Sequence, residues 1–269
     1  MSENTQSYSA KGEVSNITKR RTRFERIKIA FSKAPLSAWF GMIVLSIYLI
    51  AAFFAPFIAP HGEAEVFPVA YAPWGGEHLL GTDQIGRDIL SRLIFASRNT
   101  LGICFLACTI ALFIGTIFGI IAAIDRSYID QILSRSIDTL MAIPVMIFTF
   151  ILLSVFGPSN LNLILILGVL ESTRFFRISR SVAVGQVVLE YVEVAKLRGE
   201  KLSYIIFREI LPNIASPLIV EFGVRFIFII FTVSSLSFLG LGIQPPAADW
   251  AAMVGDCLLY TSPSPRDNR

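Results

Sequence analysis

Few residues of this chain have the types and spacing that catalysis requires. The two histidines, His61 and His78, both fall in one hydrophilic stretch, where solvated side chains are the default, and no H-E-x-x-H pattern accompanies them. Cys104 and Cys108 stand four residues apart in an apolar run without a neighbouring histidine, which is typical of small buried hydrophobes. The sequence contains no phosphate-binding G-x-x-x-x-G-K-[ST] pattern. We therefore expect a non-catalytic protein without a cofactor or a bound metal.

The composition indicates the class of protein. Hydrophobic residues make up 54% of the 269 residues and charged residues 16%, against roughly 25% charged in soluble domains. The apolar residues come in long blocks, as bilayer-spanning helices of ~20 residues require. The sequence therefore predicts an all-α polytopic membrane protein in contact with lipid. Its net charge of +3 is too small to indicate nucleic-acid binding.

One pair of charges lies inside an apolar block. Glu221 and Arg225 are four residues apart, so on a helix they face the same side and pair. Charges inside a membrane usually face a bundle interior or a translocation pathway. Near the cytoplasmic end of a span they also reach out to the headgroups. The sequence leaves both interpretations open.

The most informative polar stretch is EYVEVAKLRGEKLSYIIFREILPN, residues 190–213, between two apolar blocks. Gly199 interrupts its helical pattern, which costs ~1 kcal/mol relative to alanine and lets the chain turn. We expect a short helix, parallel to the membrane, that fills a groove on a partner. Glu193 and Arg198 would offer charges to the partner, while Ala195 would keep the contact surface small. The alternative is a basic helix whose Lys and Arg side chains meet anionic headgroups.

The apolar blocks predict five membrane spans. They are residues 36–58, 100–124, 140–156, a block that begins at 161, and 214–239. The resulting organisation is a basic cytoplasmic N-terminal segment at 1–34, a first span with an extracytoplasmic amphipathic segment at 35–98, a transmembrane core at 99–256 and a tail at 257–269.

The end of the outer segment has a helical pattern. Ile85, Ile89, Leu93 and Ile94 recur at helical spacing. This pattern predicts an amphipathic helix at the outer surface, separate from the span that follows.

The second and third spans have recognisable local features. Gly115 and Gly119 have the spacing that allows two helices to approach closely. Residues 125–138 read as a short polar turn between these spans. Pro144 predicts a kink in the early turns of the third span.

The fourth span depends on charge distribution. Its clean apolar run, 161–170, is short and is followed at once by Glu171 and Arg174. Lys and Arg accumulate on the cytoplasmic side of short loops. With a fourth crossing, eight such residues in the N-terminal segment, two in the 125–138 turn and seven in the 174–208 loop lie inside, and three lie outside. We therefore expect a fourth span that continues as a helix into the cytoplasm.

The last residues differ from the rest. CLLYTSPSPRD, residues 257–267, resembles the translation of an adapter used in DNA library preparation, and the alternative is a genuine extracytoplasmic tail rich in Ser and Pro. On the adapter interpretation, the natural chain is expected to continue past Asp256 with a sixth span.

Three segments together resemble a known family. They are GTDQIGRDILSRLIFASRNTLG at 81–102, the 190–213 segment, and SSLSFLGLGIQPPAADWAAM at 234–253. They are similar to segments of permease subunits of the dipeptide/oligopeptide/nickel subfamily of bacterial ABC importers. The middle segment resembles the "EAA" loop that docks such permeases onto their ATPase subunits. The chain departs from the family pattern at Ala96, Val194, Glu209 and Ala251.

The resemblance implies a type I ABC importer transmembrane domain, with five spans present of an expected six. It implies a binding-protein-dependent importer of peptides or similar small solutes, nickel included, in the bacterial inner membrane. The implied partners are a second permease subunit, two ATPase subunits and an extracytoplasmic solute-binding protein. The competing classes are a self-sufficient channel or ion-coupled carrier, and a membrane anchor for a signalling complex.

The resemblance also assigns two groups of site residues. The ATPase-coupling loop would consist of Glu193, Ala195, Arg198, Gly199, Ile210, Leu211 and Pro212. The motif of the first segment would consist of Gly81, Thr82, Asp83, Gly86, Arg87 and Asp88.

Overall fold

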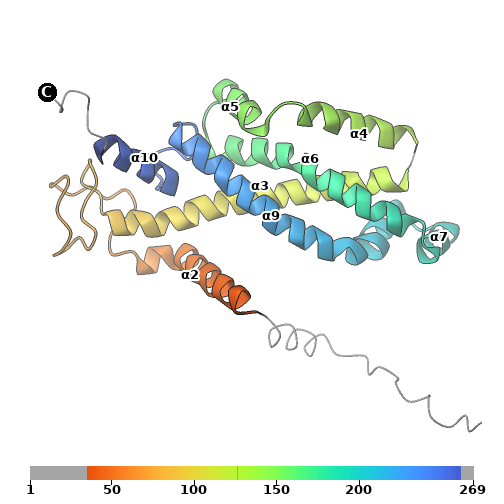
Figure 1. Cartoon of the computed structure of the whole chain (residues 1–269), viewed down its shortest axis with the longest axis horizontal. Helices are drawn as coiled ribbons and strands as arrows, with labels where there is room; N and C mark the ends of the chain where they lie inside the picture. Colours follow the sequence, from red (N-terminus) through yellow and green to blue (C-terminus); the bar gives the residue numbers. More distant parts are fainter. Residues whose placement is uncertain (1–34, 126, 262–269) are drawn as a thin grey trace, which may run out of the picture. The chain divides into compact units, whose positions relative to one another are not determined.

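The computed structural model describes residues 35–125 and 127–261. Over these residues the regular structure is helical, with only two isolated β-bridges (Figure 1). The N-terminal segment 1–34, Arg126 and residues 262–269 of the tail lie outside the described residues, and so do the expectations placed on them. The chain divides into two compact units, 1–47 and 48–269, and the packing described below is within the second.

The first two predicted spans are helical. Helix α2, Leu36–Ile58, has the predicted bounds. Helix α3, Ile89–Ile124, contains the second span but begins earlier than expected. The prediction of a separate amphipathic helix is wrong, because Ile85 precedes α3 and the rest of that pattern is its first turns. No Gly or Pro lies between Ile89 and Leu101 to end the helix.

The third span is broken rather than kinked. Helices α4, Tyr128–Met141, and α5, Val145–Phe156, meet at a bend of 85°. Pro144 lacks a backbone N–H and forces the preceding residue out of the helical conformation, so the helix ends there. The predicted polar turn at 125–138 is also wrong, since α4 occupies most of it.

Helix α6, Asn160–Val187, contains the predicted fourth span and continues past its apolar part. By length and composition three helical stretches could cross a membrane, or four if the bent α4–α5 pair is one span. Helix α6 is not among them, and beyond its apolar run it carries Glu171, Arg174, Arg177 and Arg180. The five-span topology therefore stays a prediction.

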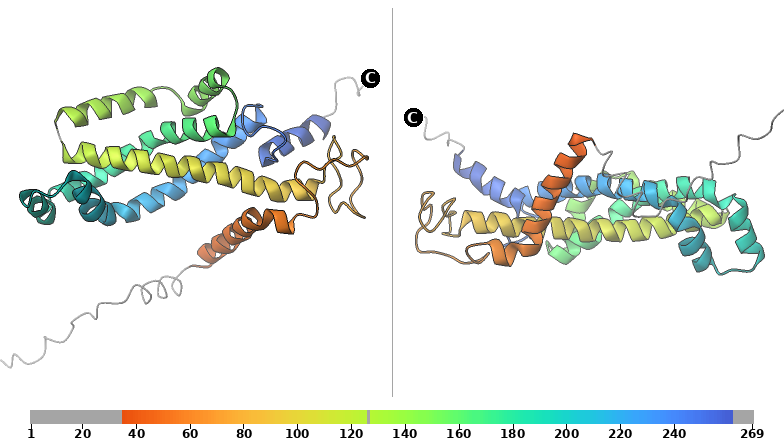
Figure 2. Two further views of the ribbon diagram at one scale, coloured as in Figure 1. Left: turned by 180° about the vertical axis from the view of Figure 1, so that it is seen from behind. Right: turned by 90° about the horizontal axis from the view of Figure 1, so that it is seen from below.

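Helices α3 and α6 pack closely along their lengths (Figure 2). A Cβ added at Gly115 would lie 2.4 Å from the backbone oxygen of Ser172, and one at Gly119 would lie 2.8 Å from that of Phe176. The two glycines therefore allow the backbones to touch, as their spacing predicted. Arg180 and Arg177 of α6 also pair with Asp130 and Asp138 of α4, and Arg180 does so through two nitrogens.

The C-terminal half consists of a short helix, a turn and a long helix. Helix α7, Glu190–Leu197, is followed by α8, Leu202–Tyr204, the π-helix η1, Ile205–Ile210, and α9, Leu211–Phe238. The last three form one apolar stretch of 37 residues that contains the predicted fifth span. Helix α10, Trp250–Thr261, follows and includes the first residues of the tail.

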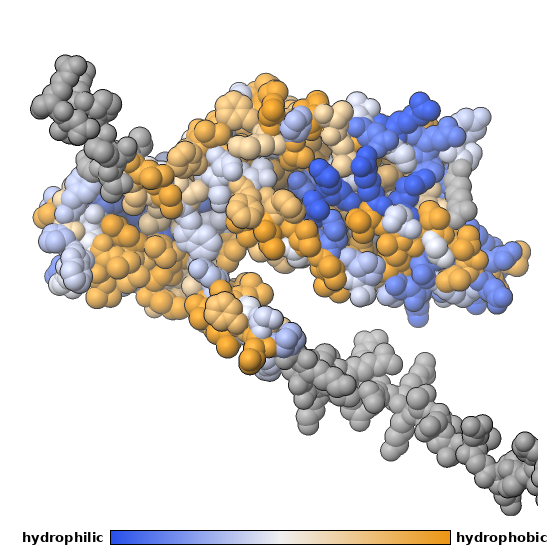
Figure 3. Space-filling view, in the orientation of Figure 1, coloured by the Kyte–Doolittle hydropathy of each residue, from blue (hydrophilic) through white to orange (hydrophobic). Residues whose placement is uncertain are grey.

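Polar and apolar residues separate along the second unit. Hydrophilic residues gather over α4, the second half of α6 and α7, whereas hydrophobic residues cover the middle of α9 (Figure 3). Two regions lie at opposite ends of α3: the α7 turn, residues 190–201, at one end, and the non-helical segment 59–88 that precedes α3 at the other.

Candidate functional site

The 190–213 segment forms a helix, a turn and a second helix. Gly199 lies in the turn with φ +74°, a left-handed conformation that favours glycine. The segment therefore reverses direction where the sequence places its glycine. Ile210 ends η1, while Leu211 and Pro212 begin α9.

The sequence predicts Ala195 on the surface that contacts a partner, but the structure places its side chain inside the chain. It is fully buried in a cluster within the chain itself. This cluster joins α3, α6, α7, η1 and α9 through Ile120, Ala123, Ala183, Val192, Ala195, Ile205, Ile206, Ile210, Ile214 and Leu218. The small side chains of α7 therefore fix this helix against its own scaffold, because they allow it to approach closely.

Tyr191 supplies a polar tie between the same elements. Its hydroxyl donates to Gln186 of α6 at 2.8 Å and accepts from Asn213 of α9 at 3.1 Å. Asn213 also donates to the carbonyl oxygen of Glu209 at 2.6 Å. These bonds hold α7 across two helices, and sequence reasoning missed Tyr191 because its partners lie on separate helices.

The outer face of α7 combines charge with exposed apolar surface. Leu197 is 81% exposed and Val194 is 50% exposed, and Glu193 lies beside them. Arg198 is exposed but approaches Glu200 at 3.8 Å. Pro212 is also exposed, at the start of α9. The outer face of α7 therefore presents both charged and apolar side chains to its surroundings.

The charges within α9 belong to a larger group. Arg225 Nε donates to Glu221 Oε1 at 2.6 Å, which confirms the predicted pairing. The pair lies in the middle of α9, about 15–21 Å along the helix from its start. Glu171 of α6 is 5% exposed and lies within electrostatic range of both residues and of Arg174. Its Oε2 atom makes no hydrogen bond to the described residues.

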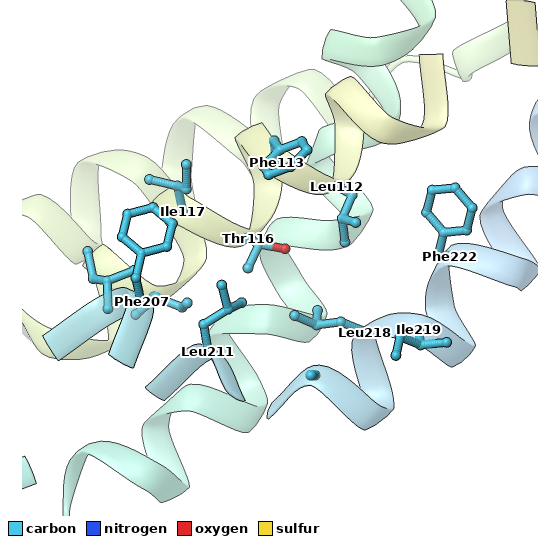
Figure 4. A pocket seen from close by; sticks show the side chains of 12 residues that line it. Leu112, Phe113, Thr116, Ile117, Phe207, Leu211, Leu218, Ile219 and Phe222 are labelled. Atoms are coloured by element: carbon cyan, nitrogen blue, oxygen red, sulfur yellow. The ribbon is translucent and has the colours of Figure 1, made fainter. Parts of the chain in front are cut away.

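An apolar groove of about 320 Å³ lies between α3 and the η1–α9 stretch (Figure 4). Thr116 is the one hydroxyl-bearing residue of its lining, beside side chains such as Phe113, Leu211 and Phe222. The lining of the groove therefore contains no charged side chain. It differs in this from the Glu171 group, which consists of Glu171, Arg174, Glu221 and Arg225.

The motif of the first segment folds the chain ahead of α3. Thr82 Oγ1 donates to the carbonyl of Val69 at 2.9 Å and accepts from the N–H of Ala72 at 2.8 Å. Added Cβ atoms at Gly81 and Gly86 would lie 2.4 and 2.3 Å from backbone oxygens, so these positions admit only glycine. The motif thus shapes residues 59–88.

Asp83 is the polar centre of that segment. Its carboxylate accepts from the N–H groups of Ile85 and Arg87, both at 2.9 Å, and from Arg87 Nε at 2.7 Å. Burial by itself raises the pKa of Asp83, but these bonds and the Arg87 charge outweigh it and hold the pKa below its ordinary value. Arg92 adds a nitrogen 3.8 Å from the same carboxylate.

The histidines of this segment are not solvated as expected. The side chains of His61 and His78 are 22% and 12% exposed, and both lie against Asp88. Asp88 caps α3 through a bond from the N–H of Ser91. Sequence reasoning could not bring these residues together, because they are separated by a non-helical chain.

The third segment of the resemblance closes onto the first. Thr100 Oγ1 donates to the buried Asp249 at 2.8 Å. Asn99 bridges the carbonyl of Ala248 and Glu63, and Trp250 Nε1 donates to the carbonyl of Leu93 at 3.1 Å. Two of the three segments therefore meet in one polar network at the start of α3.

These features describe a helical membrane protein with the short, partly exposed helix α7 at one end of α3 and the folded segment 59–88 at the other. Residues 115–259 match the binding-protein-dependent transport system inner membrane components, and residues 31–73 match the N-terminal transmembrane domain of oligopeptide transport permease C. The chain belongs to the family of binding-protein-dependent transport system inner membrane components. It is a type I ABC importer transmembrane domain and a multi-pass protein of the inner membrane.

Individual relatives agree with this assignment. The dipeptide transport system permease protein DppC of Alkalihalophilus pseudofirmus is 34% identical over 227 residues, which cover 84% of this chain and 74% of that protein. The DppC protein of Escherichia coli K12 is 34% identical over 237 residues, with coverage of 86% and 79%. A putative peptide transport system permease protein of Brucella suis is 35% identical over 216 residues, with coverage of 80% and 72%.

Proposed function

We propose that this chain is the non-catalytic permease subunit of an importer that moves peptides across the inner membrane, with ATP hydrolysis in separate subunits. The observation that carries the proposal is the outer face of α7, where Leu197, Val194 and Glu193 form an exposed, mixed surface on a helix fixed to its own scaffold. The names of the relatives support peptides as the substrate class. The absence of a phosphate-binding loop in the sequence supports the separation of ATP hydrolysis.

The proposed assembly contains a second permease subunit, two ATPase subunits and an extracytoplasmic solute-binding protein. The 190–213 segment would be its coupling element: Glu193 and Leu197 contact the ATPase, Gly199 makes the turn, and Ala195 and Ile210 anchor α7 to α9. A displacement of α7 would then reach α9 through their shared buried cluster.

The substrate path is proposed to pass the Glu171 group. Glu221 and Arg225 are mostly buried in the middle of α9, so the alternative of a pair that reaches the headgroups is less favourable. A dipeptide carries an ammonium at one end and a carboxylate at the other. Side chains of both signs on facing helices α6 and α9 provide a partner for each.

Uptake by the complete assembly tests this function. Proteoliposomes with the four partner components should take up a labelled dipeptide only with ATP and the binding protein. Arg225→Met should lower the uptake rate at least about tenfold, because it removes the cation that pairs with Glu221 and leaves two carboxylates near Arg174 alone. Thr232→Val, which removes a polar group elsewhere on α9, is the control. Uptake without ATP would indicate a self-sufficient carrier instead.

The orientation can be tested by cysteine labelling. We propose that the N-terminus and the 174–208 loop are cytoplasmic and that residues 60–98 are outside, because this topology places 17 Lys and Arg inside and three outside. In a Cys257→Ser background, a membrane-impermeant maleimide should label Glu77→Cys in sealed cells and Ser203→Cys only after permeabilisation. Both positions are exposed. Labelling of Ser203→Cys in sealed cells would reverse the topology.

A further inference from the structure

We propose that His61, His78 and Asp88 form a binding site for a divalent first-row transition cation, with Zn²⁺ as the best fit. One ring nitrogen of each imidazole and one carboxylate oxygen of Asp88 all lie within 4.8 Å of one another. This site lies ahead of α3 and is separate from both the α7 surface and the Glu171 group.

The ligand set and spacing suit Zn²⁺. Two imidazoles and one carboxylate are a common ligand set for zinc sites that keep a fourth position for water, whereas Mg²⁺ and Ca²⁺ prefer oxygen ligands. Ligands at 2.0–2.1 Å in a tetrahedron lie about 3.4 Å apart. The separations from the two carboxylate oxygens of Asp88 are close to this value: His78 Nδ1 lies 3.0 Å from Oδ1, and His61 Nδ1 lies 3.8 Å from Oδ2.

Hydrogen bonds satisfy Nδ1 of His78 and both carboxylate oxygens of Asp88, but not Nδ1 of His61. His78 Nδ1 lies 3.0 Å from Asp88 Oδ1, and Asp88 Oδ2 accepts from the N–H and hydroxyl of Ser91. The Nδ1 atom of His61 is buried and makes no hydrogen bond to the described residues. Buried polar atoms nearly always have a partner. A cation would provide one, with the proton of each neutral imidazole on Nε2.

The surroundings hold the three ligands in place. The ring of Phe67 packs edge-on against both imidazoles, at 4.8 Å from His61 and 4.6 Å from His78. Ser91 Oγ accepts from the N–H of His61 at 3.0 Å while it donates to Asp88. Such supporting bonds orient metal ligands and raise affinity. A bound ion would tie the chain that follows α2 to the start of α3.

The site is tested on the full chain purified in detergent, without partner subunits. Each protein carries Cys257→Ser, because an exposed thiol binds Zn²⁺ by itself. After chelation and dialysis against Zn²⁺, elemental analysis should find one Zn²⁺ per chain. His61→Ala should weaken binding at least about tenfold and abolish the Zn²⁺-dependent rise in Tm. Glu77→Ala, which removes an exposed carboxylate of the same segment, is the matched control.

Cobalt gives a second readout that a purely structural role of His61 would not change. Co²⁺ should show the intense visible absorption of a four-coordinate site in the wild-type chain and in Glu77→Ala, and lose it in His61→Ala. The proposal is overturned if the Cys257→Ser chain binds no Zn²⁺, or if His61→Ala binds Zn²⁺ as tightly as Glu77→Ala. Neither result depends on whether the chain transports peptides.

Discussion

Gly115→Leu is expected to prevent α3 and α6 from assembling. A Cβ at this position would lie 2.4 Å from the carbonyl oxygen of Ser172 and 2.5 Å from the Cβ of Phe175. Both are parts of the facing helix that cannot move without separating the two backbones. Overpacking usually costs about 1–3 kcal/mol, and a backbone clash along a helix pair exceeds that range. The expected result is aggregation during purification, measured as loss of the monodisperse peak in size-exclusion chromatography.

The matched control lies on the same helix. Gly102 is exposed on α3, and a Cβ there meets nothing within 4 Å. Gly102→Leu should therefore purify like the wild-type chain, since leucine also favours a helix over glycine. If Gly115→Leu gives the same monodisperse yield as Gly102→Leu, the close approach of α3 and α6 is not required for folding.

Glu193→Lys is expected to leave the chain folded and inserted but to separate it from its ATPase subunits. Glu193 is exposed on α7, so its replacement removes no buried contact. Like charges set against a partner surface cost several kcal/mol, which corresponds to a loss of affinity of more than about a hundredfold. The measurement is copurification of the ATPase subunits, together with the stimulation of their activity by the binding protein.

Gly199→Leu tests the turn rather than the surface. A side chain there has room, but its φ of +74° costs an L-residue about 1–2 kcal/mol. The turn is expected to adopt another conformation, which changes the orientation of α7. The coupling of ATP hydrolysis to uptake should then fall, while insertion into the membrane is unchanged. Glu77→Lys, the same charge reversal in the 59–88 segment, is the control for Glu193→Lys. Normal ATPase association and uptake in both Glu193→Lys and Gly199→Leu would exclude the 190–213 segment as the coupling element.

The features that the sequence predicts well are those that depend on neighbouring residues. The bounds of α2 follow from an uninterrupted apolar run, and the pairing of Glu221 with Arg225 follows from the helical repeat. Gly199 ends a helix because of its own backbone. Each of these depends on a few consecutive residues, and no distant contact is needed to specify it.

Other features depend on contacts between distant parts of the chain and could not be predicted from neighbouring residues. Helix α4 occupies a polar stretch that reads as a turn, and its pairing with α6 depends on Arg177 and Arg180, about forty to fifty positions away. Ala195 faces inward because α3, α6 and α9 surround it. The burial of Glu171 follows from the packing of α6 against other helices, above all α3, which a single sequence does not specify.

The unbroken helical stretch from Leu202 to Phe238 makes the α7 turn and the Glu171 group mechanically dependent on each other. Neither η1 nor the start of α9 interrupts it. At 1.5 Å per residue, the helical path from Leu202 to Glu221 is about 28 Å long. A continuous helix transmits a displacement better than a flexible loop does, and Pro217, which lies within α9, is the place where this stretch lacks a helical hydrogen bond. A displacement of the chain beside Gly199 would therefore reach Glu221 and Arg225 through the helix and change their position relative to Glu171.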